Sequence, residues 1–129
     1  MSLDVGLLIL RVGAGGLMMV HGIGKVADLF GGRDDFFDPF GFGPVPSLAL
    51  AAFAECLCAL AVLLGFKTRW AAVPVVITML IAAFMYHADD SFYGKEKSLL
   101  FAVCFTALLF TGGGKYSLDA LYPRRVLRR

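Results

Sequence analysis

Four stretches of the chain are strongly apolar and contain few charged residues. They cover residues 5–30, 47–65, 70–86 and 92–111, and the segments between them are rich in glycine, proline or charge. Each stretch is close to the roughly 20 apolar residues that a helix needs to cross the hydrocarbon core of a bilayer. The pattern therefore predicts an all-α fold, a transmembrane four-helix bundle.

The composition agrees with a membrane protein. The chain has 129 residues, of which 59% are hydrophobic and 17% are charged, whereas soluble domains are about 45–50% apolar and about 25% charged. A chain this short has too little interior to hide that much apolar surface from water. The net charge of +2 and the three cysteines argue against a nucleic-acid-binding protein and a disulfide-stapled module. We expect residues 1–129 to form one membrane domain that contacts lipids and no nucleic acid.

The charges in the connections predict an orientation, because Lys and Arg are enriched in short cytoplasmic connections. The second connection contains Lys67 and Arg69, and residues 115–129 form a basic tail, whereas the first and third connections are mainly acidic. Both termini are therefore expected in the cytoplasm, in a multi-pass protein of the inner (cytoplasmic) membrane. Arginines of the tail are expected near anionic lipid. A cleaved signal peptide is not expected, because the leader MSLD has no basic residue.

Two charges interrupt the apolar stretches deeply enough to need a partner or a purpose. Arg11 lies in the first stretch and Glu55 in the second, and a charge near the bilayer centre costs about 2.5–3.5 kcal/mol on insertion scales. The positions three and four residues from Glu55 are small, so its carboxylate should face the bundle and not the lipid. The sequence predicts a structural ion pair between Arg11 and Glu55. A functional role for these charges is the open alternative.

Further polar residues gather toward the outer side. His21 and Lys25 are four residues apart and share one helix face, and a histidine can exchange a proton near neutral pH. His87 lies in the third connection, and Lys95, Glu96 and Lys97 begin the last stretch. We predict a polar pocket open to the outer leaflet, although a ring of interfacial charges would give the same pattern. The predicted ligand-binding residues are His21, Lys25, Glu55, His87 and Glu96, and the candidates for catalysis are His21 and Glu55.

The sequence offers little support for metal or thiol chemistry. The two histidines have no HxxH, HxxxH or ExxH spacing, so no metal site is predicted. Cys56 and Cys58 are two residues apart and so lie on different sides of a helix, and Cys104 is in another stretch. Redox chemistry would therefore come from a bound small molecule or a partner protein.

Three short motifs carry a resemblance to a known family. They are HGIGK at residues 21–25, LGFKTR at 64–69 and GGGKYSLD at 112–119. From residue 7 to residue 121 the chain resembles the DoxX family of small four-helix membrane proteins. The family commonly has a proline where this chain has Gly113.

The resemblance implies an association with redox chemistry. The family takes its name from a subunit associated with a terminal quinol oxidase, and other relatives resemble the quinone-reducing part of thiosulfate oxidation or components of redox and stress-response assemblies. A quinone is therefore the implied cofactor, and other membrane or redox proteins are the implied partners. The polar positions of the family fall on Arg11, His21, Lys25, Glu55, Arg69, His87 and Glu96 of this chain.

Three hypotheses of function follow from these observations. The first is a redox-associated subunit that binds a quinone, a quinol or a small lipid-soluble ligand, and that is at most a subunit of a quinone-linked oxidoreductase. The second is a non-catalytic scaffold or assembly factor, in which the Arg11–Glu55 pair is structural and the aromatic connection 31–46 docks a partner. The third is a transporter, which would favour a homo-oligomer, but no internal repeat supports it.

Overall fold

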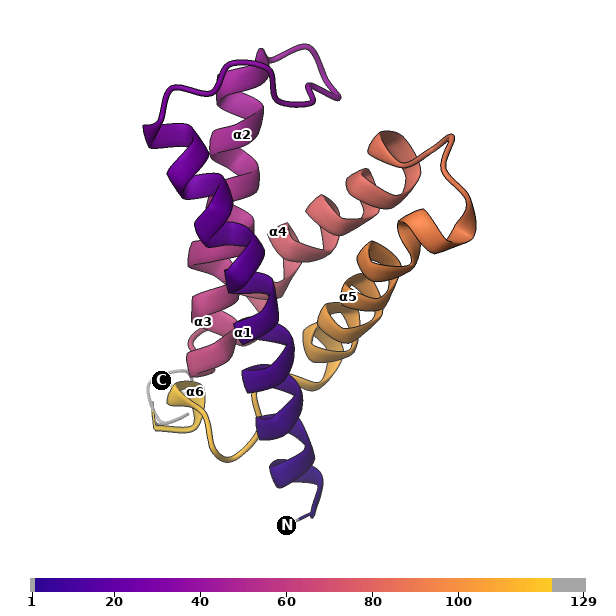
Figure 1. The fold of residues 1–129 in the computed structure, drawn as a ribbon. Coiled ribbons are helices and arrows are strands. Elements are labelled where there is room, and N and C mark those ends of the chain that lie inside the picture. Colours follow the sequence, from indigo (N-terminus) through magenta and orange to yellow (C-terminus); the bar gives the residue numbers. More distant parts are fainter. Residues whose placement is uncertain (1, 122–129) are drawn as a thin grey trace.

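The computed structural model describes residues 2–121, and within this range every regular element is a helix (Figure 1). An all-α fold is thereby confirmed for the described residues. The elements are α1 (Ser2–Phe30), α2 (Pro44–Ala52), η1 (Phe53–Cys58), α3 (Ala59–Leu64), α4 (Thr68–Ile81), η2 (Ala82–Tyr86), α5 (Phe92–Thr111) and α6 (Leu118–Leu121). The two η elements are π-helical turns within longer helices. Residues 122–129, which include the predicted tail arginines, lie outside the described range.

Three helical stretches are long and apolar enough to cross a membrane: Ser2–Phe30, Pro44–Leu64 and Thr68–Tyr86. They coincide with the first three predicted spans, and this agreement makes the chain a membrane protein with transmembrane helices. The 20 residues of α5 include three charges, Lys95, Glu96 and Lys97, near the start of the helix. The fourth span therefore stays a prediction.

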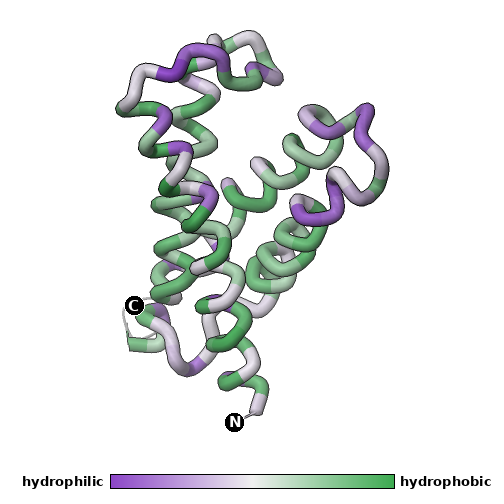
Figure 2. The backbone as a smooth tube through the Cα atoms, in the orientation of Figure 1, coloured by the Kyte–Doolittle hydropathy of each residue, from purple (hydrophilic) through white to green (hydrophobic). Residues whose placement is uncertain are grey.

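The connections divide the molecule into two ends (Figure 1). The start of α1, the turn at residues 65–67, the segment 112–117 and α6 lie at one end, here called the terminal end. The connections 31–43 and 87–91 lie at the other, the loop end. Hydrophilic residues are concentrated in the two connections at the loop end, whereas the helices between the ends are largely apolar (Figure 2).

The helices pack as two pairs that diverge toward the loop end. The stretch α2–η1–α3 packs along α1, and α4 packs along α5. A core of fully buried side chains, including Met18, Val62, Val75, Phe105 and Leu108, joins the two pairs. In Figure 1 the loop-end halves of α4 and α5 lie apart from α1 and α2, and this divergence leaves room for the pocket described below.

Two glycines of α1 let it approach the neighbouring helix backbone. A Cβ atom added at Gly15 would lie 3.1 Å from the carbonyl oxygen of Ala59, and one added at Gly22 would overlap the backbone of Glu55 and Cys56. Small residues allow such close approach in membrane helices, where dispersion contacts and hydrogen bonds drive association. The contact at Gly22 fixes the height of α1 along η1.

Two segments distant in sequence fasten together at the terminal end. The carboxylate of Asp119 accepts hydrogen bonds from the backbone amides of Lys67 (2.6 Å) and Thr68 (2.9 Å), and the Asp119 amide donates to the carbonyl of Gly65 (2.8 Å). Asp119 thus caps the amino terminus of α4, which lacks a cap from its own side chains. This contact joins the LGFKTR and GGGKYSLD motifs.

We predict that Gly22→Ala destabilises the fold, because the added methyl group meets backbone atoms that cannot rotate away. Overpacking of this kind costs about 1–3 kcal/mol. The matched control is Gly24→Ala in the same helix, where an added Cβ has no described atom within 4 Å. Unfolding of both variants in detergent, followed by circular dichroism, should show a loss for Gly22→Ala alone. Equal stability of the two variants would contradict the packing described here.

Candidate functional site

A pocket of about 510 Å³ opens at the loop end between the two helix pairs. Its walls come from the second half of α1, the connection 31–43, α2, η1, the end of α4 with η2, and the first half of α5. The volume falls within the range of about 300–1,000 Å³ that is typical of small-molecule sites. Four of the five predicted ligand-binding residues line it together: His21, Lys25, Glu55 and His87.

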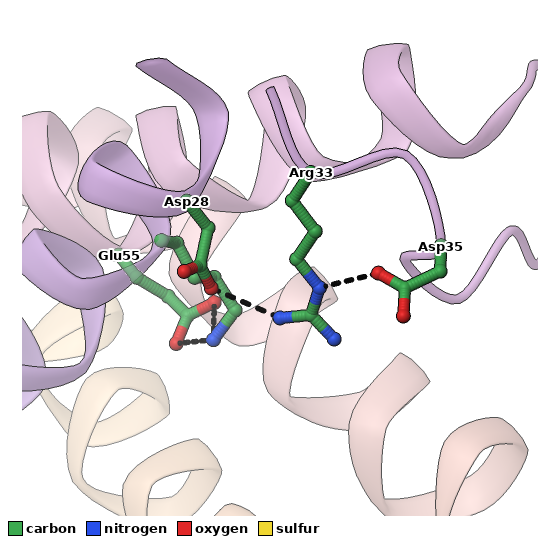
Figure 3. Close-up of polar contacts among 5 residues, drawn as sticks. Asp28, Arg33, Asp35 and Glu55 are labelled. Carbon is green, nitrogen blue, oxygen red and sulfur yellow. Dashed lines mark hydrogen bonds and ion pairs between the residues drawn. The ribbon is translucent and has the colours of Figure 1, made fainter. Parts of the chain in front are cut away.

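The most buried ion pair among the described residues joins Lys25 to Glu55, whose carboxylate is labelled in Figure 3. The ammonium nitrogen of Lys25 lies 2.8 Å from one carboxylate oxygen of Glu55 and 2.9 Å from the other. The Glu55 side chain is only 4% exposed, whereas that of Lys25 is 26% exposed. Lys25 therefore compensates the buried charge of Glu55 and remains open to the pocket.

The predicted ion pair between Arg11 and Glu55 is wrong. Among the described residues, the Arg11 guanidinium donates instead to the backbone carbonyls of Val62 (3.4 Å), Leu63 (3.0 Å) and Tyr116. Arg11 precedes Lys25 by 14 residues, which corresponds to about 21 Å along a helix. Once the Gly22 contact sets Lys25 beside Glu55, Arg11 is left at the terminal end.

Arg11 has a clear structural role in that position. Its side chain is almost fully buried, with 1% of the residue exposed. The carbonyls of Val62 and Leu63 belong to the last turn of α3, at the negative end of the helix dipole, and that of Val62 also accepts a hydrogen bond from the Gly65 amide (3.0 Å). Arg11 supplies both the hydrogen bonds and the positive charge. The polar positions implied by the resemblance thus divide between two ends and do not form one shared site.

Glu96 is not among the residues that line the pocket in the described structure, whereas the next residue, Lys97, is. Glu96 is exposed on α5. Adjacent positions on a helix differ by about 100° around its axis, so a run of three charges cannot all face one pocket. The run Lys95-Glu96-Lys97 therefore indicated that a charged residue lies at the pocket, but it did not show which of the three residues that is.

Aromatic rings cover much of the pocket wall. Four come from the connection 31–43, namely Phe36, Phe37, Phe40 and Phe42, and the others are Tyr86 and Phe101. The rings of Phe37 and Tyr86 lie 5.3 Å apart at 69°, which joins the connection to η2. His21 meets Phe101 edge to face at 6.1 Å. The site therefore combines apolar rings with a small number of hydrogen-bonding groups.

Arg33 holds the connection 31–43 in place by contacting two carboxylates, one on α1 and one within the connection. The Arg33 guanidinium contacts Asp28 of α1 at 2.9 Å and Asp35 of the connection at 2.8 Å (Figure 3). Asp28 shares a helix face with His21 and Lys25, since the three are spaced i, i+4, i+7. That spacing is a signal in the sequence that could have assigned Asp28 to the site.

Asp38 organises the tip of the same connection. Its carboxylate accepts hydrogen bonds from the amides of Gly41 (2.9 Å), Phe42 (3.1 Å) and Gly43 (2.9 Å) and from the hydroxyl of Ser47 (3.1 Å). Burial raises the pKa of Asp38, but these hydrogen bonds to the charged form outweigh it, so the pKa of Asp38 lies below its ordinary value.

His87 occupies the far rim of the pocket. Its Nδ1 atom lies 2.6 Å from a carboxylate oxygen of Asp90, and its ring packs edge to face on Tyr86. The residue directly follows the π-helical turn η2, as Glu55 lies within the π-helical turn η1. Such turns change the direction in which following side chains point, and they are frequent at functional sites. Within residues 2–121, no group of three or more His, Cys, Asp or Glu side chains is arranged to hold a metal.

Apolar helices of membrane-spanning length with a pocket between them at the loop end define a helical membrane protein. The DoxX family model matches residues 6–88. The chain is 31% identical over 128 residues to the inner membrane protein YqjF of Escherichia coli (strain K12), with 95% of each chain covered. The chain belongs to the DoxX family, which confirms the resemblance. No solved structure matches it.

We predict strong energetic coupling between Lys25 and Glu55. Removing one partner of a buried pair leaves an uncompensated charge, so Lys25→Met and Glu55→Gln should each lower the free energy of unfolding. The loss in the double variant should be smaller than the sum of the two single losses. Contacting residues couple by roughly 0.5–3 kcal/mol. Arg11→Gln with Glu55→Gln is the control cycle, and it should be additive within about 0.5 kcal/mol. Coupling in the control cycle but not in the first would restore the discarded pair.

We also predict that the connection 31–43 loosens in acid. Because the pKa of Asp38 is depressed in the folded protein, its stabilising contribution is present above the ordinary pKa of about 3.9. That contribution is lost as the pH falls through the lower folded value.

Asp38→Ala should raise the rate of hydrogen exchange at the amides of Gly41, Phe42 and Gly43 at neutral pH, by roughly ten-fold for the loss of one net hydrogen bond. Asp34→Ala, at an exposed carboxylate of the same connection, is the control. Unchanged exchange in Asp38→Ala would refute the role assigned to Asp38.

Proposed function

We propose that this protein binds the head group of a quinone or quinol in the loop-end pocket and serves as a redox-associated membrane subunit. The observation that carries the proposal is the composition of the pocket, in which aromatic walls surround His21, Lys25, Glu55 and His87. Flat rings pack on aromatic side chains, and a quinone head group needs hydrogen-bond partners for its two carbonyl oxygens. A bound quinone would supply the electron chemistry that the side chains lack.

The side chains have distinct roles in this proposal. Lys25 stays partly exposed while it contacts Glu55, so its ammonium group can donate to one carbonyl oxygen. His21 lies against Phe101 on the same wall, and its ring nitrogens can form a hydrogen bond to the second carbonyl oxygen. His87 lines the far rim beside Asp90, which orients its ring. Glu55 holds Lys25 in position.

The proposal includes a location and a topology. We place the chain in the inner (cytoplasmic) membrane, with four spans and both termini in the cytoplasm. The similarity to YqjF, an inner membrane protein, supports the location. The basic residues Lys67, Arg69 and Lys115 at the terminal end support the orientation. The loop-end pocket then opens toward the outer leaflet.

The alternative function is a scaffold or assembly factor for a redox or stress-response complex. It rested in part on a structural Arg11–Glu55 pair, which the structure replaces with two separate contacts. It also rested on the aromatic connection as a docking surface. Four rings of that connection line the pocket, and two of them, Phe40 and Phe42, are also exposed. The pocket therefore favours ligand binding as the first proposal.

The test is quinone retention. Protein purified in mild detergent should carry close to one quinone per chain, measured by mass spectrometry of the lipid extract. Glu55→Gln and His21→Ala should lose most of the bound quinone while remaining folded. Glu96→Gln is the matched control, because it makes the same change at an exposed carboxylate outside the pocket. No quinone in the wild type, or equal retention in all variants, would contradict the proposal.

A further inference from the structure

A second cavity adjoins the loop-end pocket. It is a groove of about 490 Å³ between α1 and α5. Three residues, His21, Lys97 and Phe101, line both cavities. The pocket and the groove therefore meet at this shared wall.

The groove differs from the pocket in chemistry. Apart from His21 and Lys97 at the junction, every residue that lines it within the described chain is apolar or small. The α1 side runs from Ile9 to His21, which corresponds to about 18 Å along a helix. Gly13 and Cys104 face the same cavity from the two helices. The groove is thus long and apolar, and within the described chain its one charged residue, Lys97, lies at the end that joins the pocket.

We infer that this groove holds the isoprenoid tail of the ligand whose head group occupies the loop-end pocket. The inference rests on the proposed function and names the ligand class more closely, as an amphiphile with a long apolar tail. A head group held by Lys25 needs an apolar exit for its tail. The rim formed by Arg33, Asp35 and the His87–Asp90 pair is charged, so the tail leaves along α1 and α5.

Gly13 provides a direct way to fill the groove. A Cβ atom added there has no described atom within 4 Å, and the residue has an ordinary helical conformation. Gly13→Leu therefore has space for its Cβ atom, and the rest of the side chain would occupy the groove that Gly13 lines. Gly6→Leu is the matched control, because Gly6 lies seven residues earlier on nearly the same face of α1, is equally open, and is not part of the groove.

The experiment measures the binding of two benzoquinones with the same head group, one with a single isoprene unit and one with a long isoprenoid tail. We expect Gly13→Leu to weaken binding of the long-tailed quinone by roughly ten-fold, as for the loss of about two buried methylene contacts. Binding of the short quinone should not change. Gly6→Leu should resemble the wild type with both, and Glu55→Gln should weaken both.

The outcomes separate the two proposals. Unchanged long-tailed binding in Gly13→Leu, together with a loss in Glu55→Gln, would overturn the groove assignment and leave the proposed function intact. Equal weakening by Gly13→Leu and Gly6→Leu would also overturn it, because the effect would then not be local to the groove. If the wild type binds neither quinone, both proposals are overturned.

Discussion

The arrangement of the helices depends on one buried ion pair, in which Lys25 compensates the negative charge of the Glu55 carboxylate within an apolar environment. Glu55 is almost fully buried, and its charge is tolerated because Lys25 contacts both of its oxygens. This pairing requires α1 to lie close to η1, and Gly22 permits that approach because any larger side chain would meet the Glu55 backbone. The position of α1 along its neighbour follows from these two contacts. Lys25 and Glu55 line the pocket, which lies at the loop end where the two pairs of helices diverge.

A second group of polar contacts lies at the terminal end. Arg11 binds the last carbonyls of α3, and Asp119 caps the start of α4. Both satisfy helix-end groups that would otherwise lack hydrogen-bond partners in an apolar environment. The turn at Gly65 adopts a left-handed conformation and accepts a hydrogen bond from the Asp119 amide. The molecule therefore has one end fastened by backbone contacts and one end that opens into a pocket.

Much of this arrangement could be predicted from the sequence, and the errors have a common physical cause. Apolar length located the first three spans, and the small residues around Glu55 correctly indicated that it faces the interior. Arg11 and Lys25 were both available partners on α1, and choosing between them requires the relative height of two helices. That height depends on a backbone contact at Gly22 and a π-helical turn, and hydrophobic periodicity reports neither. Choosing between Glu96 and Lys97 as the residue that faces the pocket requires the rotation of α5 about its own axis, which the sequence pattern does not give either.

The most direct test of this account is a distance measurement in lipid bilayers by magic-angle-spinning NMR. The sequence holds two glutamates, so Glu96→Gln leaves Glu55 as the one site for a ¹³C-labelled carboxylate, beside ¹⁵N-labelled lysine and arginine side chains. The account predicts strong dipolar coupling between the Glu55 carboxylate and a lysine Nζ, abolished by Lys25→Met, and none to an arginine. Coupling to an arginine side chain, lost in Arg11→Gln, would contradict it.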